Sequence, residues 1–443
     1  MAETTVLTRK KELVYYGDDF TGSTDVLESL SLKGKRTVLW LRIPEPSELA
    51  QFEEYSCIGL AGVSRSKDPK WMNTELPAVF RFLNSMNPKY VHYKVCSTFD
   101  SNVSKGNISA AMHIGVDIIK PAWTSILVGT PKIKRYVCFG QLFADYKGEV
   151  FSIDRHPVMS CHPATPMNES NLIQHMKALG SDNCVSLNLS MYHLENTSSI
   201  LSDYIRNEKV VIFDTYDAQS LACAGALIRE HSQSGTHFTV SSSGFEDAIY
   251  SKDTDIKNIA IKSKKRILAL SGSCSLITSA QIDYAIEHGF SPIKLKVSRL
   301  LNPSERSSYL DEVTGYCMSL LADDISPLVY SAKGPTDESL SLIKESDCDS
   351  FDQILGQFLG DIAVQLANNK MIDRLAVAGG DTSGYCLQCL DVDALTFVAP
   401  FCPGVPLCRT YSRKNNVDGL EVALKGGQLG GDDFFVKLLN GEE

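Results

Sequence analysis

Two adjacent carboxylates lie in a loop near the start of the chain, in the segment LVYYGDDFTGSTDVLESL (Leu13–Leu30). A short apolar run leads into two glycines five residues apart, and an amphipathic run follows. This strand–loop–helix layout is that of a phosphate-binding P-loop, but Ser23 stands where that motif has lysine. Carboxylates repel phosphate, whereas they accept hydrogen bonds from hydroxyl groups. Asp18 and Asp19 therefore indicate a hydroxylated substrate rather than a triphosphate.

Other loops of the N-terminal half also carry single polar and ionic residues. Lys94 and Asp100 lie in YKVCSTFDS, after an apolar run, and Arg155 and His156 lie in RHPVMSCHPATPM. Polar loop residues at strand ends are often functional. The three basic side chains suit a carboxylate, and Asp100 adds an acceptor for hydroxyls. This combination is typical of a sugar-acid site, although a turn or capping role is the alternative for Asp100.

Three loops of small residues mark the C-terminal half: SGSCS (Ser271–Ser275), GGDTSG (Gly379–Gly384) and LKGGQLGG (Leu424–Gly431). Glycines let backbone amides converge on an anion, and the N-terminus of a helix adds partial positive charge. Loops that end parallel strands lie together at the carboxyl edge of the sheet. Together the three loops indicate a phosphate or nucleotide cradle. The missing G-x-G-x-x-G spacing argues against a dinucleotide.

The elements that must position these residues alternate between apolar strands and helical patterns. The expected strands are residues 13–16, 36–41, 57–63, 90–96, 210–215, 237–244, 267–275 and 374–380, with helices at 24–32, 76–86, 276–288 and 351–367. Strands separated by helices predict an α/β fold with mainly parallel or mixed β-sheets flanked by helices. The polar stretch Ser251–Arg266 interrupts this alternation. We therefore expect two domains, residues 1–255 and 256–443.

Composition excludes several classes of protein. The chain has 443 residues and a formal net charge of −10, and its basic runs do not exceed Lys262–Arg266, so nucleic-acid binding is not expected. No segment approaches the ~20 apolar residues of a membrane span, and we expect a cytoplasmic protein. The 13 cysteines are scattered, as reduced thiols are. Cys386 and Cys389 form C-x-x-C inside an expected helix, which favours one buried face over a zinc site. The sequence contains no G-x-S-x-G nucleophile elbow, which argues against a serine hydrolase.

Seven ordered motifs resemble those of the four-carbon acid sugar kinase family: DDFTGSTD, YKVCSTFDS, RHPVMSCHPATPM, SGSCS, GGDTSG, PGVPL and LKGGQLGGDDFF. The resemblance covers about residues 13 to 437. It implies an N-terminal sugar-acid-binding domain and a C-terminal nucleotide-binding domain. It also implies ATP-dependent phosphorylation of a hydroxyl of threonate, erythronate or a 3-oxo-tetronate, with Mg²⁺ accompanying ATP. The long segment Cys408–Gly427 makes a branched acid such as 3-oxo-isoapionate the alternative.

The resemblance also implies roles for single residues. The ATP contacts would be Ser273, Gly379, Gly380, Asp381, Thr382 and Gly427, and the family often has Glu at the position of Asp381. The substrate-side residues would be Asp18, Asp19, Lys94, Asp100, Arg155 and His156. The metal ligands stay open. The expected mechanism has Arg155 and Lys94 holding the carboxylate of the acid. Asp19 accepts the proton of the attacking hydroxyl, and Asp18 is its rival for that role.

Two other functional classes are alternatives to a kinase. One is a non-catalytic sugar-acid sensor, which the intact acidic and glycine loops argue against. The other is a nicotinamide-dependent oxidoreductase, which the missing fingerprint argues against. The expected partners are a small sugar acid and ATP, with a homodimer as the candidate assembly and no nucleic acid or membrane.

Overall fold

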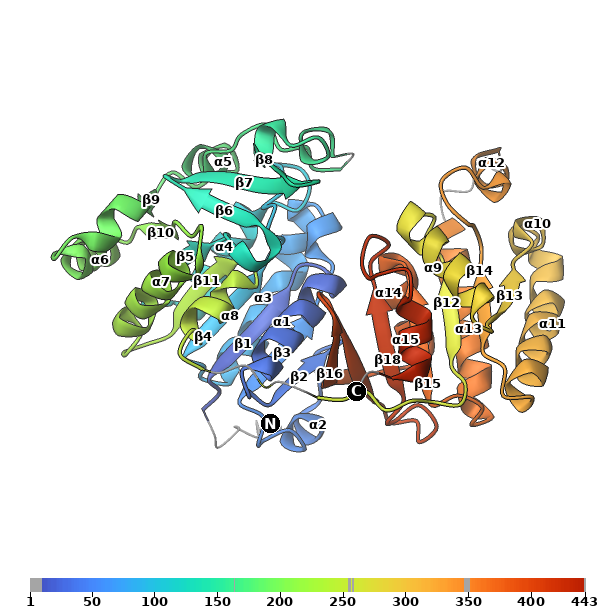
Figure 1. Cartoon of the computed structure of the whole chain (residues 1–443). Helices are drawn as coiled ribbons and strands as arrows, with labels where there is room; N and C mark the ends of the chain where they lie inside the picture. Colours follow the sequence, from blue (N-terminus) through green and yellow to red (C-terminus); the bar gives the residue numbers. More distant parts are fainter. Residues whose placement is uncertain (1–9, 163, 254–255, 257–258, 346–350, 442–443) are drawn as a thin grey trace. The chain divides into compact units, whose positions relative to one another are not determined.

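The computed structural model describes residues 10–162, 164–253, 256, 259–345 and 351–441. It contains two compact units, Met1–Asp255 and Ile256–Glu443, and each is considered by itself below. Four residues of the polar stretch at the expected boundary, 254–255 and 257–258, lie outside the described residues. Both units contain a β-sheet flanked by helices (Figure 1), which confirms the expected α/β class.

The sheet of the first unit is entirely parallel. Its order is β2 (Thr37–Trp40), β3 (Cys57–Ala61), β1 (Leu13–Gly17), β4 (Tyr90–Lys94), β11 (His237–Ser241), β5 (Trp123–Leu127), β10 (Val210–Phe213) and β9 (Cys184–Leu187). Residues of β1 and β4 are fully buried, as expected when helices cover both faces of a parallel sheet. Because the strands run the same way, their carboxyl ends and the loops that follow lie along one edge.

Helices cover both faces of this sheet. They are α1 (Phe20–Leu32), α2 (Pro46–Ala50), α3 (Pro69–Ser85), α4 (Ile108–Ile119), α5 (Leu172–Ala178), α6 (Thr197–Arg206), α7 (Ala218–His231) and α8 (Gly244–Ile249). Helix α3 packs on α4, whereas α8 packs on α1 and α7. Helix α1 begins four residues before the expected start, because the Asp19 side chain accepts the amide hydrogen of Gly22 and caps it.

A small antiparallel sheet, which the sequence did not predict, follows β5. It consists of β6 (Arg135–Cys138), β7 (Gln141–Tyr146) and β8 (Glu149–Ser152). The turn between β6 and β7 is held by the carboxylate of Asp214, which accepts hydrogen bonds from the amides of Phe139 and Gly140 at 2.5 and 2.9 Å. The chain that leaves β8 contains Arg155 and His156.

The second unit has a mixed sheet. Its parallel part is β13 (Ser291–Lys294), β14 (Pro327–Tyr330), β12 (Leu268–Ser271), β15 (Arg374–Ala378) and β18 (Glu421–Lys425), and it continues antiparallel through β17 (Val405–Tyr411) to β16 (Ala394–Cys402). The helices are α9 (Leu276–Glu287), α10 (Val297–Leu301), α11 (Pro303–Ala322), α12 (Glu338–Glu345), α13 (Phe351–Asn368), α14 (Gly380–Cys389) and α15 (Phe434–Asn440).

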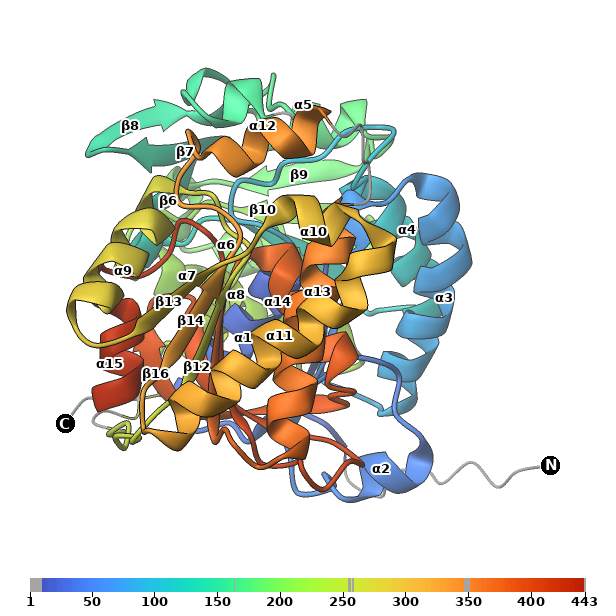
Figure 2. The same cartoon turned by 90° about the vertical axis from the view of Figure 1, so that its right-hand side faces the viewer.

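The helices of the second unit form two groups. Helix α9 packs on α15, and α13 packs on α14 and α11 (Figure 2). Apolar side chains of α9 and α15 share a core with alternate residues of the strands, among them Ile282, Phe435 and Ala376. This arrangement leaves the loops after β12, β15 and β18 at the carboxyl edge of the parallel strands.

Three further findings concern the described part of the chain. None of its helices combines the length and the apolar character needed to cross a membrane. Its cysteines are all free thiols, and Cys386 and Cys389 lie on α14 as expected. No group of three or more His, Cys, Asp or Glu side chains among these residues is arranged to hold a metal ion.

Candidate functional site

The loops after β1, β3 and β4 are tied together at the carboxyl edge of the first sheet. The amide of Asp18 donates to the carbonyl of Lys94 at 2.9 Å, and the amide of Arg65 donates to the carbonyl of Asp18 at 3.0 Å. These backbone bonds bring three charged side chains from distant parts of the sequence into one cluster.

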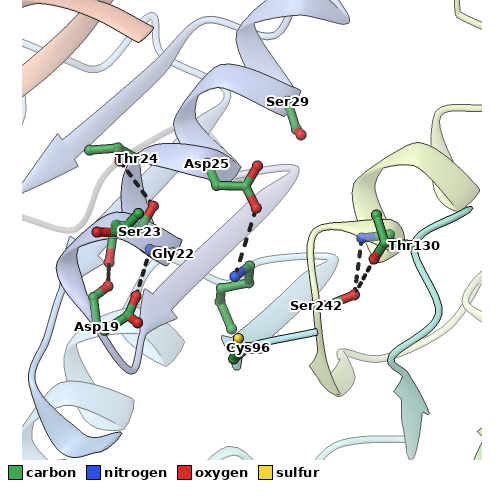
Figure 3. A network of polar contacts seen from close by, with 12 residues as sticks. Asp19, Gly22, Ser23, Thr24, Asp25, Ser29, Cys96, Thr130 and Ser242 are labelled. Carbon is green, nitrogen blue, oxygen red and sulfur yellow. Dashed lines mark hydrogen bonds and ion pairs between the residues drawn. The ribbon is translucent and has the colours of Figure 1, made fainter. Parts of the chain in front are cut away.

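Asp19 has two structural partners. Its Oδ1 accepts the amide hydrogen of Gly22 at 2.5 Å, and its Oδ2 accepts from Arg65 Nη1 at 2.9 Å. A Cβ atom on Gly22 would lie 2.7 Å from Asp19 Oδ1 and 2.9 Å from Lys94 Nζ. Figure 3 shows Asp19 turned toward Gly22 at the start of α1. A side chain at position 22 would therefore displace the Asp19 carboxylate or the Lys94 amino group from the place where they converge.

Asp100 is held by a cation and two hydroxyl groups. Arg65 Nη2 donates to both carboxylate oxygens, at 2.7 and 2.9 Å. The hydroxyls of Thr98 and Thr165 also donate to this carboxylate. Burial alone would raise the pKa of Asp100, but the guanidinium and the hydroxyls outweigh it and the pKa is lowered. Asp100 is thus a fixed anion that holds Arg65 in place.

Asp18 has the opposite environment. It is 4% exposed, and its Oδ1 has no hydrogen-bond partner among the described residues. Burial, followed by the charge of Asp19, raises the pKa of Asp18 to about 8, against the lowering influence of Arg65 and Lys94. An acceptor without a partner, with a pKa near neutrality, has the properties of a group that exchanges a proton with a ligand.

Lys94 is the second cation of this cluster. Its side chain is 5% exposed, and its Nζ lies 3.8 Å from Asp25 Oδ2 on α1. Four predicted substrate residues, Asp18, Asp19, Lys94 and Asp100, therefore lie together.

The structure does not bring Arg155 and His156 into this cluster. The Arg155 side chain is 84% exposed, and its closest carboxylate is that of its neighbour Asp154 at 3.9 Å. His156 is buried, and its Nδ1 accepts from the amides of Val158 and Met159, both at 3.2 Å. Burial lowers the pKa of His156. In this conformation His156 shapes the turn after β8 rather than contacting the acidic cluster.

Arg155→Ala is therefore expected to change the KM for the sugar acid by less than about threefold, because truncation of an exposed side chain away from the cluster removes little binding energy. Steady-state kinetics with the acid as varied substrate check this. A rise in KM of tenfold or more would show that the loop carries Arg155 to the ligand.

Sequence reasoning missed three residues of the cluster: Arg65, Thr98 and Thr165. Arg65 follows β3 in GVSRSKDP, at a strand end like the other predicted residues, so the same positional rule would have found it. Thr165 belongs to RHPVMSCHPATPM, and this segment reaches the cluster through its hydroxyl rather than through its arginine. Nothing in the spacing of that segment indicates whether its threonine or its arginine reaches the cluster.

A cavity of about 580 Å³ lies at the carboxyl edge of the parallel strands in the second unit. This volume is in the usual range for sites of small molecules and cofactors. The six predicted nucleotide contacts, Ser273, Gly379, Gly380, Asp381, Thr382 and Gly427, all line it. Its other lining residues are Gly272, Cys274, Ser275, Leu276, Pro335, Asp352, Leu355 and Gln428.

Glycines keep this cavity open. Gly379 has a φ of +122°, and a Cβ there would lie 2.8 Å from Thr382 Oγ1. Gly380 begins α14, and a Cβ there would meet no protein atom within 4 Å. Ser275 caps α9, whose first residue, Leu276, also lines the cavity. Two helix N-termini therefore converge on the cavity, as expected of an anion site.

The donor set of this cavity fits Mg²⁺ that arrives with a nucleotide. Mg²⁺ in such sites is held by one or two carboxylates and by the phosphates of the substrate. Asp352 and Asp381 are the carboxylates that line the cavity, and they would be the protein ligands.

Comparison with known proteins shows that each unit matches a known domain family. Residues 13–249 match the sugar-binding N-terminal domain, and residues 268–435 match the nucleotide-binding C-terminal domain. The chain is 37% identical to the 3-oxo-isoapionate kinase of Paraburkholderia graminis, over 97% of this chain and 94% of that protein. It is 28% identical to a 3-oxo-tetronate kinase of Brucella melitensis, over 94% and 93%.

A Salmonella typhimurium protein of known structure shares the fold, with a TM-score of 0.81 and 23% identity over 96% of this chain and 98% of the other. Together, the two matched domains and the identity over nearly the full length show that the chain belongs to the four-carbon acid sugar kinase family.

Proposed function

We propose that the protein is a kinase that transfers the γ-phosphoryl group of ATP to a hydroxyl of a short-chain sugar acid. One observation supports this most strongly. The unit that matches a nucleotide-binding domain has a glycine-lined cavity, and the unit that matches a sugar-binding domain has a cluster of carboxylates and cations. Phosphoryl transfer needs positioning and neutralisation of charge more than covalent chemistry, and these two sites supply both.

Among the acids, 3-oxo-isoapionate is the first to test and a 3-oxo-tetronate the second. The identity to the 3-oxo-isoapionate kinase is 37%, whereas that to the Brucella melitensis and Pectobacterium atrosepticum 3-oxo-tetronate kinases is 28% and 26%. Threonate and erythronate complete the set. A cytoplasmic location and a homodimer stay predictions.

Asp18 is the better candidate for the proton acceptor. Both oxygens of Asp19 already accept hydrogen bonds, from Gly22 and from Arg65. Asp18 has an oxygen without a partner among the described residues, and its pKa is raised to about 8. A general base works best when its pKa is near the operating pH. The roles assigned from the sequence are thereby exchanged: Asp19 positions, and Asp18 takes the proton.

The other charged groups orient the two substrates. Lys94 and Arg65 are the cations available to the carboxylate of the acid, and Asp19 and Asp100 hold Arg65 in position. Backbone amides of the glycine loops, with Ser273 and Thr382, bind the phosphates. Mg²⁺, when bound with ATP, neutralises charge on the transferred group.

The test is ADP release in a coupled assay with ATP, Mg²⁺ and each of the four acids. We expect turnover with 3-oxo-isoapionate or a 3-oxo-tetronate, in the range of about 1–100 s⁻¹ that is typical of kinases. Binding of an acid without ADP release would instead support the non-catalytic sensor. No response to any of the acids would reject the proposed substrate class.

A further inference from the structure

The cavity of the second unit has an unusual charge for a site that takes a polyphosphate. Its lining, as far as the structure describes it, contains no lysine, arginine or histidine. It does contain the carboxylates of Asp352 and Asp381. Backbone amides and two helix N-termini offer only partial positive charge. Mg²⁺ and a residue behind the lining are two sources that could supply a full positive charge.

Lys425 is such a residue. It ends β18, directly before the Gly426–Gly427 turn, and it is 1% exposed. Its Nζ donates to the carbonyl of Gly426 at 3.2 Å and to Thr278 Oγ1 at 3.1 Å. Thr278 Oγ1 in turn donates to the carbonyl of Gly427, which lines the cavity, at 3.1 Å. The amino group thus lies just behind the glycine loop.

Lys425 also lacks a carboxylate counter-ion in the described part of the chain. No ion pair joins it to a carboxylate within the described residues, where most other buried cations, such as Lys94 and Arg374, have one. The groups packed around it are Thr278 of α9 and the ring of Phe434 on α15, 5.5 Å away. Cys402 of β16 is the titratable group whose charge reaches it. Burying an amino group without a counter-ion is costly, unless an anion arrives to compensate for it.

Burial lowers the pKa of Lys425 to about 8. The amino group is therefore partly neutral in slightly alkaline solution, and a nearby anion will favour its protonated form. Phosphate groups are fully ionised well above pH ~6, so at pH 8.5 the nucleotide itself has no proton to lose or gain.

We propose that Lys425 is the buried cation that balances nucleotide phosphate from behind the glycine loop, and that nucleotide binding completes the protonation of its amino group from solvent. Lys425 acts through the Gly426–Gly427 turn and is a positioning residue. The inference rests on the proposed nucleotide site and adds a charge and a proton to it.

Calorimetry on the full chain tests this, with a non-hydrolysable ATP analogue and Mg²⁺ at pH 8.5, in two buffers with different ionisation enthalpies. The wild-type protein is expected to take up about half a proton or more per nucleotide, seen as a buffer-dependent heat. Lys425→Met is expected to lose this uptake and to bind about tenfold more weakly. Lys414→Met, at an exposed lysine paired with Asp391, is the matched control and keeps both properties.

The outcomes are distinguishable. Buffer-independent heat in the wild type, or uptake that persists in Lys425→Met, overturns the inference and leaves the proposed function standing. A wild-type protein that binds no nucleotide overturns both. Thermal unfolding shows whether Lys425→Met is folded, and if it is not, the wild-type heats alone decide.

Discussion

Asp18→Asn is expected to lower the turnover of sugar-acid phosphorylation by ~10²–10⁴-fold, the usual contribution of a general base. Asparagine keeps the shape of the side chain but cannot take up a proton. Binding of the ATP analogue should be unchanged, since the nucleotide cavity lies in the other unit. The measurements are kcat from the coupled assay and nucleotide affinity by calorimetry.

The pH dependence of kcat/KM tests the role of Asp18 independently. Because the pKa of Asp18 is raised to about 8, wild-type kcat/KM is expected to rise with pH and to level off above that value, as the carboxyl group ionises. Turnover that stays within threefold of wild type in Asp18→Asn would remove this residue from the mechanism.

Stability separates loss of chemistry from loss of fold. The folded protein holds the proton of Asp18 more tightly than the unfolded chain, whose aspartates have pKa values near ~4. Between these values unfolding releases a proton, so this group makes the protein less stable as pH rises from about 4 to about 8. Asp18→Asn should therefore raise Tm relative to wild type at pH 8.5 and change it less at pH 5.

The neighbouring carboxylate is the matched comparison. Asparagine can still cap α1 at position 19, but it loses the ion pair with Arg65. We expect Asp19→Asn to raise the KM for the acid more than it lowers kcat. A kcat loss larger in Asp19→Asn than in Asp18→Asn would restore the assignment made from the sequence.

The sequence alone could predict the structural features that depend on a local pattern of residues. Apolar runs indicate buried strands such as Leu13–Gly17, and helical periodicity indicates helices such as Phe351–Asn368. The glycine loops after β12, β15 and β18 were recognisable because each follows a strand, and parallel strands collect such loops at one edge. Helix α1 began early because a single residue, Asp19, serves both as a cap and in the site.

What depended on contacts between distant segments could not be read from the sequence. Arg65 joins Asp19 and Asp100, which lie 46 and 35 residues away along the chain. The difference between Asp18 and Asp19 arises from burial and from hydrogen bonds, and adjacent identical residues carry no such signal. The burial of Lys425, which lies within the segment Leu424–Gly431, likewise has no signal in the local sequence.

Gly380→Val is expected to weaken nucleotide binding by ~10–100-fold. A Cβ atom there meets no protein atom within 4 Å, so we expect the free protein to accommodate valine at the start of α14. Gly380 lines the cavity, however, and a branched side chain would occupy space that the phosphates need. Forcing extra methyl groups into a packed site costs ~1–3 kcal/mol, which gives the expected range. Calorimetric titration with the ATP analogue measures it.

Gly384→Val is the control that makes this result interpretable. Gly384 lies on the same helix, a Cβ there also meets no atom within 4 Å, and it does not line the cavity. Both variants replace a glycine of α14 by valine, so a general effect of valine on this helix would appear in both. Weakened binding confined to Gly380→Val would show that the nucleotide contacts this loop. Wild-type affinity in both variants would mean that the phosphates bind elsewhere, and the roles proposed for Asp381, Thr382 and Lys425 would be lost with it.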